Sequence, residues 1–144
     1  MRFKSILVIA LVFSQLQFFA QKLKWHTDYE EAKKIAKKSN KKLLLDFTGS
    51  DWCGYCIRLR KDVFEDPKFK KWANDKLVLV ELEFPRKKIL PNKLKQQNQM
   101  LLKKFKVRGF PTLFFLTSEE KVLGSMSGYR DLNAWIKEAD GIIK

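Results

Sequence analysis

The chain has 144 residues, of which 45% are hydrophobic and 13% aromatic. This length and composition fit one domain with a real hydrophobic core, and they exclude a small scaffold that depends on several disulfides. The formal net charge is +14. The lysines are spread along the whole sequence, which is typical of solvated surfaces and argues against a nucleic-acid-binding protein.

Residues 1–20 have the layout of a secretory signal peptide. Two basic residues precede an unbroken apolar run over 6–13, which is too short to span a membrane, and Ala20 is a small residue at a cleavage position. We therefore expect a signal peptide over 1–20 and one domain over 21–144. The mature protein would be periplasmic or secreted without stable membrane insertion, and an uncleaved N-terminal membrane anchor is the alternative.

A helix followed by a buried strand is expected at the start of the domain. Within 25–41, Thr27 and Glu30 form a capping box ahead of an apolar face with helical spacing. Residues 43–47 then form a continuous apolar run, which is typical of a short strand buried on both faces.

The next helix and strand follow the same logic. Cys56, Leu59 and Val63 lie at helical spacing, with Arg60 among the residues expected to face outward. A proline marks a break, one short helical turn follows, and residues 76–84 read as a second central strand.

The second half begins with a basic stretch over 86–95, for which a solvated linker is favoured over a partner-docking loop. A helix is expected over 97–106. A strand then begins at Pro111 and leads into a hairpin, and Asp131 caps a final amphipathic helix. Strands separated by helices imply parallel neighbours, and the hairpin adds an antiparallel edge. The sequence therefore predicts an α/β fold with one mixed sheet flanked by helices on both faces.

The only two cysteines, Cys53 and Cys56, lie where the buried strand gives way to a helix. A helix N-terminus offers free N–H groups and the positive end of the helix dipole, which stabilise a thiolate at Cys53. Cys56 lies one turn further along, where it can attack a mixed disulfide formed by Cys53 and release the product. The spacing predicts a redox-active pair.

Three other uses of the cysteines fit less well. A tetrahedral zinc site needs more ligands than the cysteines and His26 supply. Attachment of a c-type haem needs histidine after the second cysteine, where the chain has Ile57. A purely structural disulfide would close too small a loop to constrain the unfolded chain much. We therefore expect no metal and no cofactor beyond the redox-active disulfide itself.

The segment LLLDFTGSDWCGYC resembles the active-site segment of the thioredoxin superfamily, above all secreted thioredoxin-like proteins with a DFTGSDWCGxC signature. VRGFPT, later in the chain, matches the second landmark of that superfamily, so the resemblance covers nearly all of 21–144. It implies the thioredoxin fold and thiol–disulfide oxidoreductase activity. It also implies these roles: Cys53 as nucleophile, Cys56 as resolving thiol, Trp52 as a shielding aromatic, Pro111 as a cis-proline facing the disulfide, and Asp46 as a buried acid.

Asp46 has a physical reading of its own. A carboxyl group inside an apolar strand would have a raised pKa and could exchange the proton of Cys56; the alternative is a local capping or hydrogen-bonding role. Members of the superfamily often pair this acid with a lysine on the neighbouring strand. Residues 77–84 contain no lysine, and Glu81 lies there instead.

The residues around the pair indicate how partners bind and which way electrons flow. A cis bond before Pro111 would leave the preceding backbone free to pair with an extended substrate, and Phe110, Trp52 and Tyr55 would make the rim aromatic. Tyr55 supplies no positive charge between the cysteines, which favours a reducing couple. We expect a monomeric protein-disulfide reductase with disulfide-containing clients; the resemblance implies a membrane thiol-transfer donor.

The competing hypothesis is a non-catalytic binding module. In that case the same fold would present Phe110, Tyr55 and the basic surface to a partner protein, and the cysteines would be incidental. The presence of both cysteines argues against this hypothesis.

Overall fold

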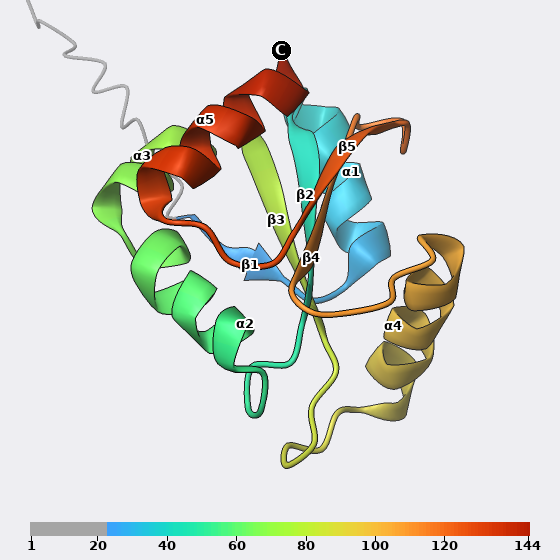
Figure 1. Ribbon diagram of the computed structural model, residues 1–144. Helices are drawn as coiled ribbons and strands as arrows, with labels where there is room; N and C mark the ends of the chain where they lie inside the picture. Colours follow the sequence, from blue (N-terminus) through green and yellow to red (C-terminus); the bar gives the residue numbers. More distant parts are fainter. Residues whose placement is uncertain (1–22) are drawn as a thin grey trace, which may run out of the picture.

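The computed structural model describes residues 23–144, so the signal peptide predicted over 1–20 lies outside the described residues. A twisted sheet forms the middle layer, and helices cover both of its faces (Figure 1). None of the helices within 23–144 is long and apolar enough to cross a membrane. In chain order the elements are β1 (Trp25–His26), α1 (Tyr29–Ser39), β2 (Lys42–Thr48), α2 (Gly54–Leu59), the π-helical segment η1 (Arg60–Phe64), α3 (Pro67–Asn74), β3 (Leu77–Glu83), α4 (Asn92–Lys104), β4 (Thr112–Leu116), β5 (Val122–Ser127) and α5 (Leu132–Ile143).

The sheet has five strands in the order β1-β3-β2-β4-β5. β1 and β2 run parallel to β3, whereas β4 is antiparallel to both β2 and β5. The parallel pairing predicted for helix-separated strands is therefore confirmed for β2 and β3 and wrong for β4. The register gives the reason: Thr48 pairs with Glu83 and Phe47 with Thr112, so β3 ends and β4 begins at the same edge of the sheet. The segment after α4 returns the chain to that edge before β4 starts (Figure 1).

The sheet separates two hydrophobic clusters because successive side chains of a strand point to opposite faces. One cluster joins Leu44 of β2 to α3 and α5, and its largest side chain, Trp135, is fully buried. The other joins Leu43 and Leu45 to α1 and α4. β2 lies between both clusters, and all of its residues from 43 to 48 are buried. The buried strand predicted over 43–47 is confirmed, and it gives the site a rigid base.

Two helix starts differ from the sequence-based prediction. Asp28, rather than Thr27, caps α1, and its side chain accepts a hydrogen bond from the N–H of Glu31 at 3.0 Å. β1 occupies the residues just before it and sets the entry one residue later. α4 begins at Asn92, so the second half of the predicted basic loop over 86–95 is helical. The first turn of α4 is almost entirely polar, and it therefore gives no amphipathic signal.

Candidate functional site

The two cysteines follow β2, at the end of the sheet where β3 ends and β4 begins. Cys53 is the N-cap residue of α2, and it forms a disulfide with Cys56 in the first turn. The N–H of Cys56 points at the Cys53 sulfur at 3.2 Å. Both residues are buried, Cys53 at 7% and Cys56 at 4% exposed. The predicted strand-to-helix setting of the pair is confirmed.

The free N–H groups at the start of a helix stabilise negative charge in front of them. Here a sulfur atom already occupies that position, because the Cys56 N–H is directed at it. A reduced Cys53 would therefore form its thiolate next to a backbone donor and the positive end of the dipole. The arrangement favours nucleophilic sulfur chemistry at Cys53.

Asp46 forms the floor of the site within β2. Its side chain is 2% exposed, and its Oδ1 atom has no hydrogen-bond partner. Burial raises the pKa of Asp46 to about 8; the positive charge of Arg60 opposes that rise, and the negative charges of Glu81 and Glu83 add to it. An acid with this pKa exchanges its proton near neutral pH. The raised pKa predicted from the strand setting is thus present.

The neighbour of Asp46 on β3 is Glu81, where the sequence offers no lysine. The structure supplies a cation from another element. Arg60, at the start of η1, forms an ion pair with Glu81, and its guanidinium carbon lies 5.4 Å from the centre of the Trp25 ring. The guanidinium of Arg60 therefore lies close enough to Asp46 to lower the pKa of that carboxyl group, and it acts against the effect of burial.

The outward orientation predicted for Arg60 is wrong. That prediction placed Arg60 with Arg58 and Lys61 on the solvent face of the helix. The Arg60 N–H donates to the Cys56 carbonyl four residues back, so Arg60 lies on the same helix face as the buried Cys56, toward the sheet. The π-helical turn begins only at Arg60, where the Glu65 N–H bonds back to the Arg60 carbonyl at 2.9 Å, five residues away.

The loop before β4, which contains Phe110 and Pro111, borders the site. The Phe110–Pro111 peptide bond is cis. The Thr112 hydroxyl donates to the Gly109 carbonyl at 2.7 Å, and the Gly128 N–H donates to the Pro111 carbonyl at 3.0 Å. Because Thr112 pairs with Phe47 near the end of β2, the register places this loop beside the turn that carries the cysteines.

Aromatic side chains connect these walls. The Trp52 ring meets the Phe110 ring edge to face at 5.9 Å, and Phe110 contacts Phe84 at 5.1 Å between ring centres. Trp52 is half-buried, because its Nε1–H donates to the Phe84 carbonyl at 2.8 Å and fixes the ring against the protein. Tyr55 is 63% exposed, as expected for a rim residue.

Other ligand chemistry has little support in this part of the molecule. Within residues 23–144 no group of three or more His, Cys, Asp or Glu side chains is arranged to hold a metal ion. His26, the only histidine of the chain, lies in β1, the outermost strand on the β3 side of the sheet. The register thus places the cysteine turn, the Pro111 loop and the end of β2 that carries Asp46 at the same end of the sheet, and His26 lies apart in β1.

The sequence of this domain is similar to those of known proteins. The chain matches the thioredoxin-like domain family over residues 29–140. Among curated proteins, the disulfide bond reductase DsbH of Chlamydia pneumoniae is 40% identical over 107 residues, which cover 74% of this chain and 64% of DsbH. The thioredoxin-related protein DsbJ of the same organism is 40% identical over 97 residues, which cover 67% of this chain and 28% of DsbJ. The chain therefore spans less than two thirds of these curated relatives.

Solved structures of related proteins have the same fold. A structure titled DsbH oxidoreductase superposes with a TM-score of 0.78 at 35% identity, covering 85% of each chain. A putative disulphide-isomerase from Bacteroides thetaiotaomicron superposes with a TM-score of 0.62 at 28% identity, covering 81% of this chain and 88% of the other. The fold, the site and these similarities agree: the chain belongs to the thioredoxin-like family.

Proposed function

We propose that this protein is a thiol–disulfide oxidoreductase that reduces disulfides in partner proteins. The observation that carries the proposal is the Cys53–Cys56 disulfide at the N-terminus of α2. The similarity to DsbH, which is named a disulfide bond reductase, supports the reducing direction. Tyr55, between the cysteines, adds no positive charge that would stabilise the reduced pair and make it a strong oxidant.

The reaction begins with the reduced pair. The Cys53 thiolate attacks one sulfur of a partner disulfide, forms a mixed disulfide and expels the other partner sulfur as a thiolate, which takes up a proton. The Cys56 thiolate then attacks the Cys53 sulfur, releases the second partner thiolate and closes the Cys53–Cys56 bond. Two electrons pass to the partner, and a thiol donor must return them before the next cycle.

Asp46 is the proposed acceptor for the proton that Cys56 loses in the second step. Its carboxyl group is buried, its Oδ1 atom has no other partner, and burial raises its pKa to about 8. A group with this pKa can take up a proton near neutral pH and return it when the disulfide is reduced again. The Arg60–Glu81 ion pair keeps a compensating positive charge nearby.

The rim residues are the proposed platform for the partner. The cis bond before Pro111 and the half-buried Phe110 and Trp52 give a short apolar edge beside the disulfide. Tyr55 projects from the first turn of α2 and extends that edge. The partner's extended segment would pair its backbone with the chain just before Pro111.

The proposed cellular setting rests on the signal peptide expected at the N-terminus. A cleaved signal peptide over 1–20 would place the protein in the periplasm or outside the cell, and an uncleaved one would anchor it to a membrane there. In an oxidising compartment a reductase needs electrons from elsewhere. A membrane thiol-transfer protein is the donor we propose.

Two cysteine variants test the function. Cys53→Ser should lose reduction of a model protein disulfide and form no mixed disulfide, because the attacking sulfur is gone. Cys56→Ser should accumulate the mixed disulfide, which non-reducing electrophoresis detects. A Cys53→Ser protein that still reduces the substrate would contradict the mechanism, and a wild type that binds partners without reducing them would favour a binding module.

A further inference from the structure

The segment that follows β3 is fastened to the turn that carries the cysteines. The Asp51 carboxylate accepts three hydrogen bonds from the backbone N–H groups of Arg86, Lys87 and Lys88, at 3.0, 2.7 and 2.9 Å. The two segments lie side by side at the lower edge of Figure 1. Because Asp51 lies just before the first cysteine, these bonds fix the position of the loop relative to the disulfide.

Side chains add to this attachment. The Arg86 guanidinium carbon lies 3.8 Å from the centre of the Trp52 ring, and the Lys88 ammonium donates to the Ser50 hydroxyl at 2.9 Å. The Ser50 N–H in turn donates to the Glu83 carboxylate at 2.8 Å. The loop is therefore part of the wall of the site, and the solvated-linker interpretation of this stretch is wrong for its first half.

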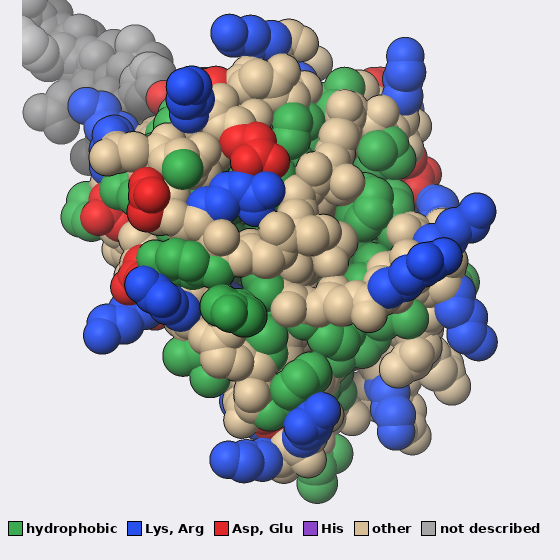
Figure 2. All heavy atoms as spheres, in the orientation of Figure 1, with side chains coloured by type: hydrophobic (Ala, Val, Ile, Leu, Met, Phe, Trp, Pro, Cys, Tyr) green, Lys and Arg blue, Asp and Glu red, His purple; other side chains and the backbone are tan. Residues whose placement is uncertain are grey.

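The positive charges of this loop have no carboxylate partner among the described residues. Arg86, Lys87 and Lys88 are exposed, and none of them takes part in an ion pair within 23–144. The Asp51 carboxylate accepts three backbone N–H groups of this loop, and the positive charge of Lys88 contributes to its lowered pKa. Figure 2 shows Lys and Arg side chains around this lower edge. Three positive side chains against one ionised carboxylate leave the loop with a net positive charge, which attracts negatively charged groups.

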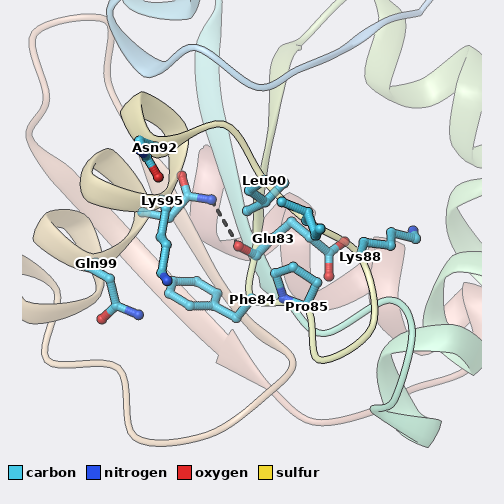
Figure 3. Close-up of a pocket in the computed structure, with 10 residues that line it drawn as sticks. Glu83, Phe84, Pro85, Lys88, Leu90, Asn92, Lys95 and Gln99 are labelled. Atoms are coloured by element: carbon cyan, nitrogen blue, oxygen red, sulfur yellow. Dashed lines mark hydrogen bonds between the residues drawn. The ribbon is translucent and has the colours of Figure 1, made fainter.

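A pocket of about 320 Å³ continues the rim between this loop and α4. Phe84, Pro85 and Leu90 give it an apolar lining, and Lys88 and Lys95 lie on opposite sides of it (Figure 3). The one carboxylate in the lining is that of Glu83 at the end of β3; its Oε1 accepts the Ser50 N–H, and its Oε2 is buried without a hydrogen-bond partner. The two lysines could pair with an acidic side chain of a bound partner, and the apolar walls could contact an aliphatic side chain next to it.

We propose that the basic rim, formed by Arg86, Lys87 and Lys88 together with this pocket, binds an acidic segment that flanks the disulfide of a partner protein. The proposal rests on the function proposed above and names the class of partner for the same site. A partner joined to Cys53 in a mixed disulfide must pass Trp52, over which Arg86 lies. The residues next to the partner's cysteine therefore meet the rim first, and aspartate or glutamate there would be favoured.

The test uses two peptides that each contain the same internal disulfide, flanked by glutamates in one and by lysines in the other. The full chemically reduced protein is mixed with each peptide in a single turnover, and the second-order rate constant of reduction is measured. The wild type should react at least about tenfold faster with the acidic peptide at low salt. The preference should shrink as salt is raised, because added ions screen the rim.

A charge-reversed double variant, Lys87→Glu/Lys88→Glu, should lose or invert this preference. The matched control, Lys37→Glu/Lys38→Glu, changes two adjacent exposed lysines by the same charge at the end of α1, next to the start of β2 and so at the opposite end of the sheet from the cysteines. It should keep the wild-type preference. Circular dichroism verifies that both variants fold.

Several results would overturn the proposal. These are equal rates for both peptides in the wild type, an unchanged preference in the loop variant, or equal losses in the loop variant and the control. Ile89, 97% exposed beside the lysines, makes a lipid surface the rival occupant. Wild-type binding to anionic vesicles that the loop variant loses, with peptide preference unchanged, would assign the rim to lipid. Reduction of neither peptide would contradict the proposed function itself, which keeps the two failures distinct.

Discussion

Asp46 and Asp51 lie on the same short stretch of chain and face opposite environments. Asp46, inside β2, is buried with one carboxylate oxygen unpartnered, and its pKa rises to about 8. Asp51, on the turn before the cysteines, is only partly buried and accepts three backbone N–H groups, which lower its pKa to about 2. Burial disfavours the charged form of an acid, and donated hydrogen bonds favour it.

The contrast separates two tasks around the disulfide. Asp46, in the floor of the site, holds a proton that can be exchanged near neutral pH. Asp51, beside the basic rim, stays ionised above about pH 2 and fixes the backbone of residues 86–88. The floor should therefore govern how fast the sulfur chemistry runs, and the rim should govern which partners are held. Variants in both regions test this division, and the buried acid should give the greatest change.

Asp46→Asn should slow the resolution of the mixed disulfide by roughly 100-fold near pH 8, because the proposed proton acceptor for Cys56 is lost. The wild-type rate should rise as pH passes about 8, since the ionised form of Asp46 then accumulates. The variant should keep only the pH dependence of the thiol. Rapid quenching followed by mass spectrometry of the mixed disulfide measures both rates. Asp75→Asn, an exposed substitution at the end of α3, is the control; superimposable pH profiles for all three proteins would remove Asp46 from the mechanism.

The free energy of unfolding should depend on pH because of the buried Asp46. The pKa of Asp46 is about 8 in the folded protein, above the 3.8 of an unperturbed aspartate, so the folded state keeps a proton that the unfolded state releases. The stabilisation is complete below about pH 4 and is lost as pH rises toward 8, by at most about 1.4 kcal/mol per pH unit. Urea unfolding across this range should show that loss in the wild type relative to Asp46→Asn. Parallel curves for the two proteins would contradict a raised pKa.

Gly49→Ala should loosen the rim. A Cβ atom at Gly49 would lie 2.5 Å from the Trp52 Nε1 atom, so the indole must move and give up its bond to the Phe84 carbonyl. We expect a loss of about 1–3 kcal/mol in the free energy of unfolding. Gly141→Ala in α5, where an added Cβ meets nothing within 4 Å, is the control and should lose no stability. Equal unfolding free energies for both variants would show that the indole is not held there.

Asp51→Asn should have the smallest and most local effect. The variant keeps the size of the side chain but loses the charge, so the amides of residues 86–88 should exchange with solvent faster while the sheet is unchanged. In the wild type the contribution is present above an aspartate's usual pKa and disappears as pH falls through about 2. Amide shifts of 86–88 in an acid titration measure it; a midpoint near 4 would mean that the hydrogen bonds do not hold the anion.

The floor was predictable from the sequence because its signals are side-chain signals. The continuous apolar run over 43–47 predicts a buried strand, and an aspartate within it must be buried with its neighbours. Cys53 then falls at the start of a helix by the same reading. The position of the reactive pair and the burial of Asp46 followed from these patterns alone.

The rim and the cation near Asp46 were not predictable in this way. The loop at 86–88 is held by its own backbone N–H groups, which every non-proline residue carries, so no residue pattern marks the contact with Asp51. Arg60 was misplaced because a charged side chain is expected to face solvent, whereas Arg60 follows the buried Cys56 by one helical turn and forms an ion pair with Glu81. The direction of β4 depends on the path of the chain after α4, a tertiary feature without a local signal.

The reduction potential of the Cys53–Cys56 pair tests the central claim most directly. The protein is equilibrated with defined mixtures of reduced and oxidised glutathione, the thiols are trapped by alkylation, and the oxidised fraction is counted by mass spectrometry. A reductant of this fold should have a potential nearer to roughly −270 mV than to roughly −120 mV, so that the pair stays oxidised in all but strongly reducing mixtures. A potential near the upper value would make the protein an oxidant and contradict the account.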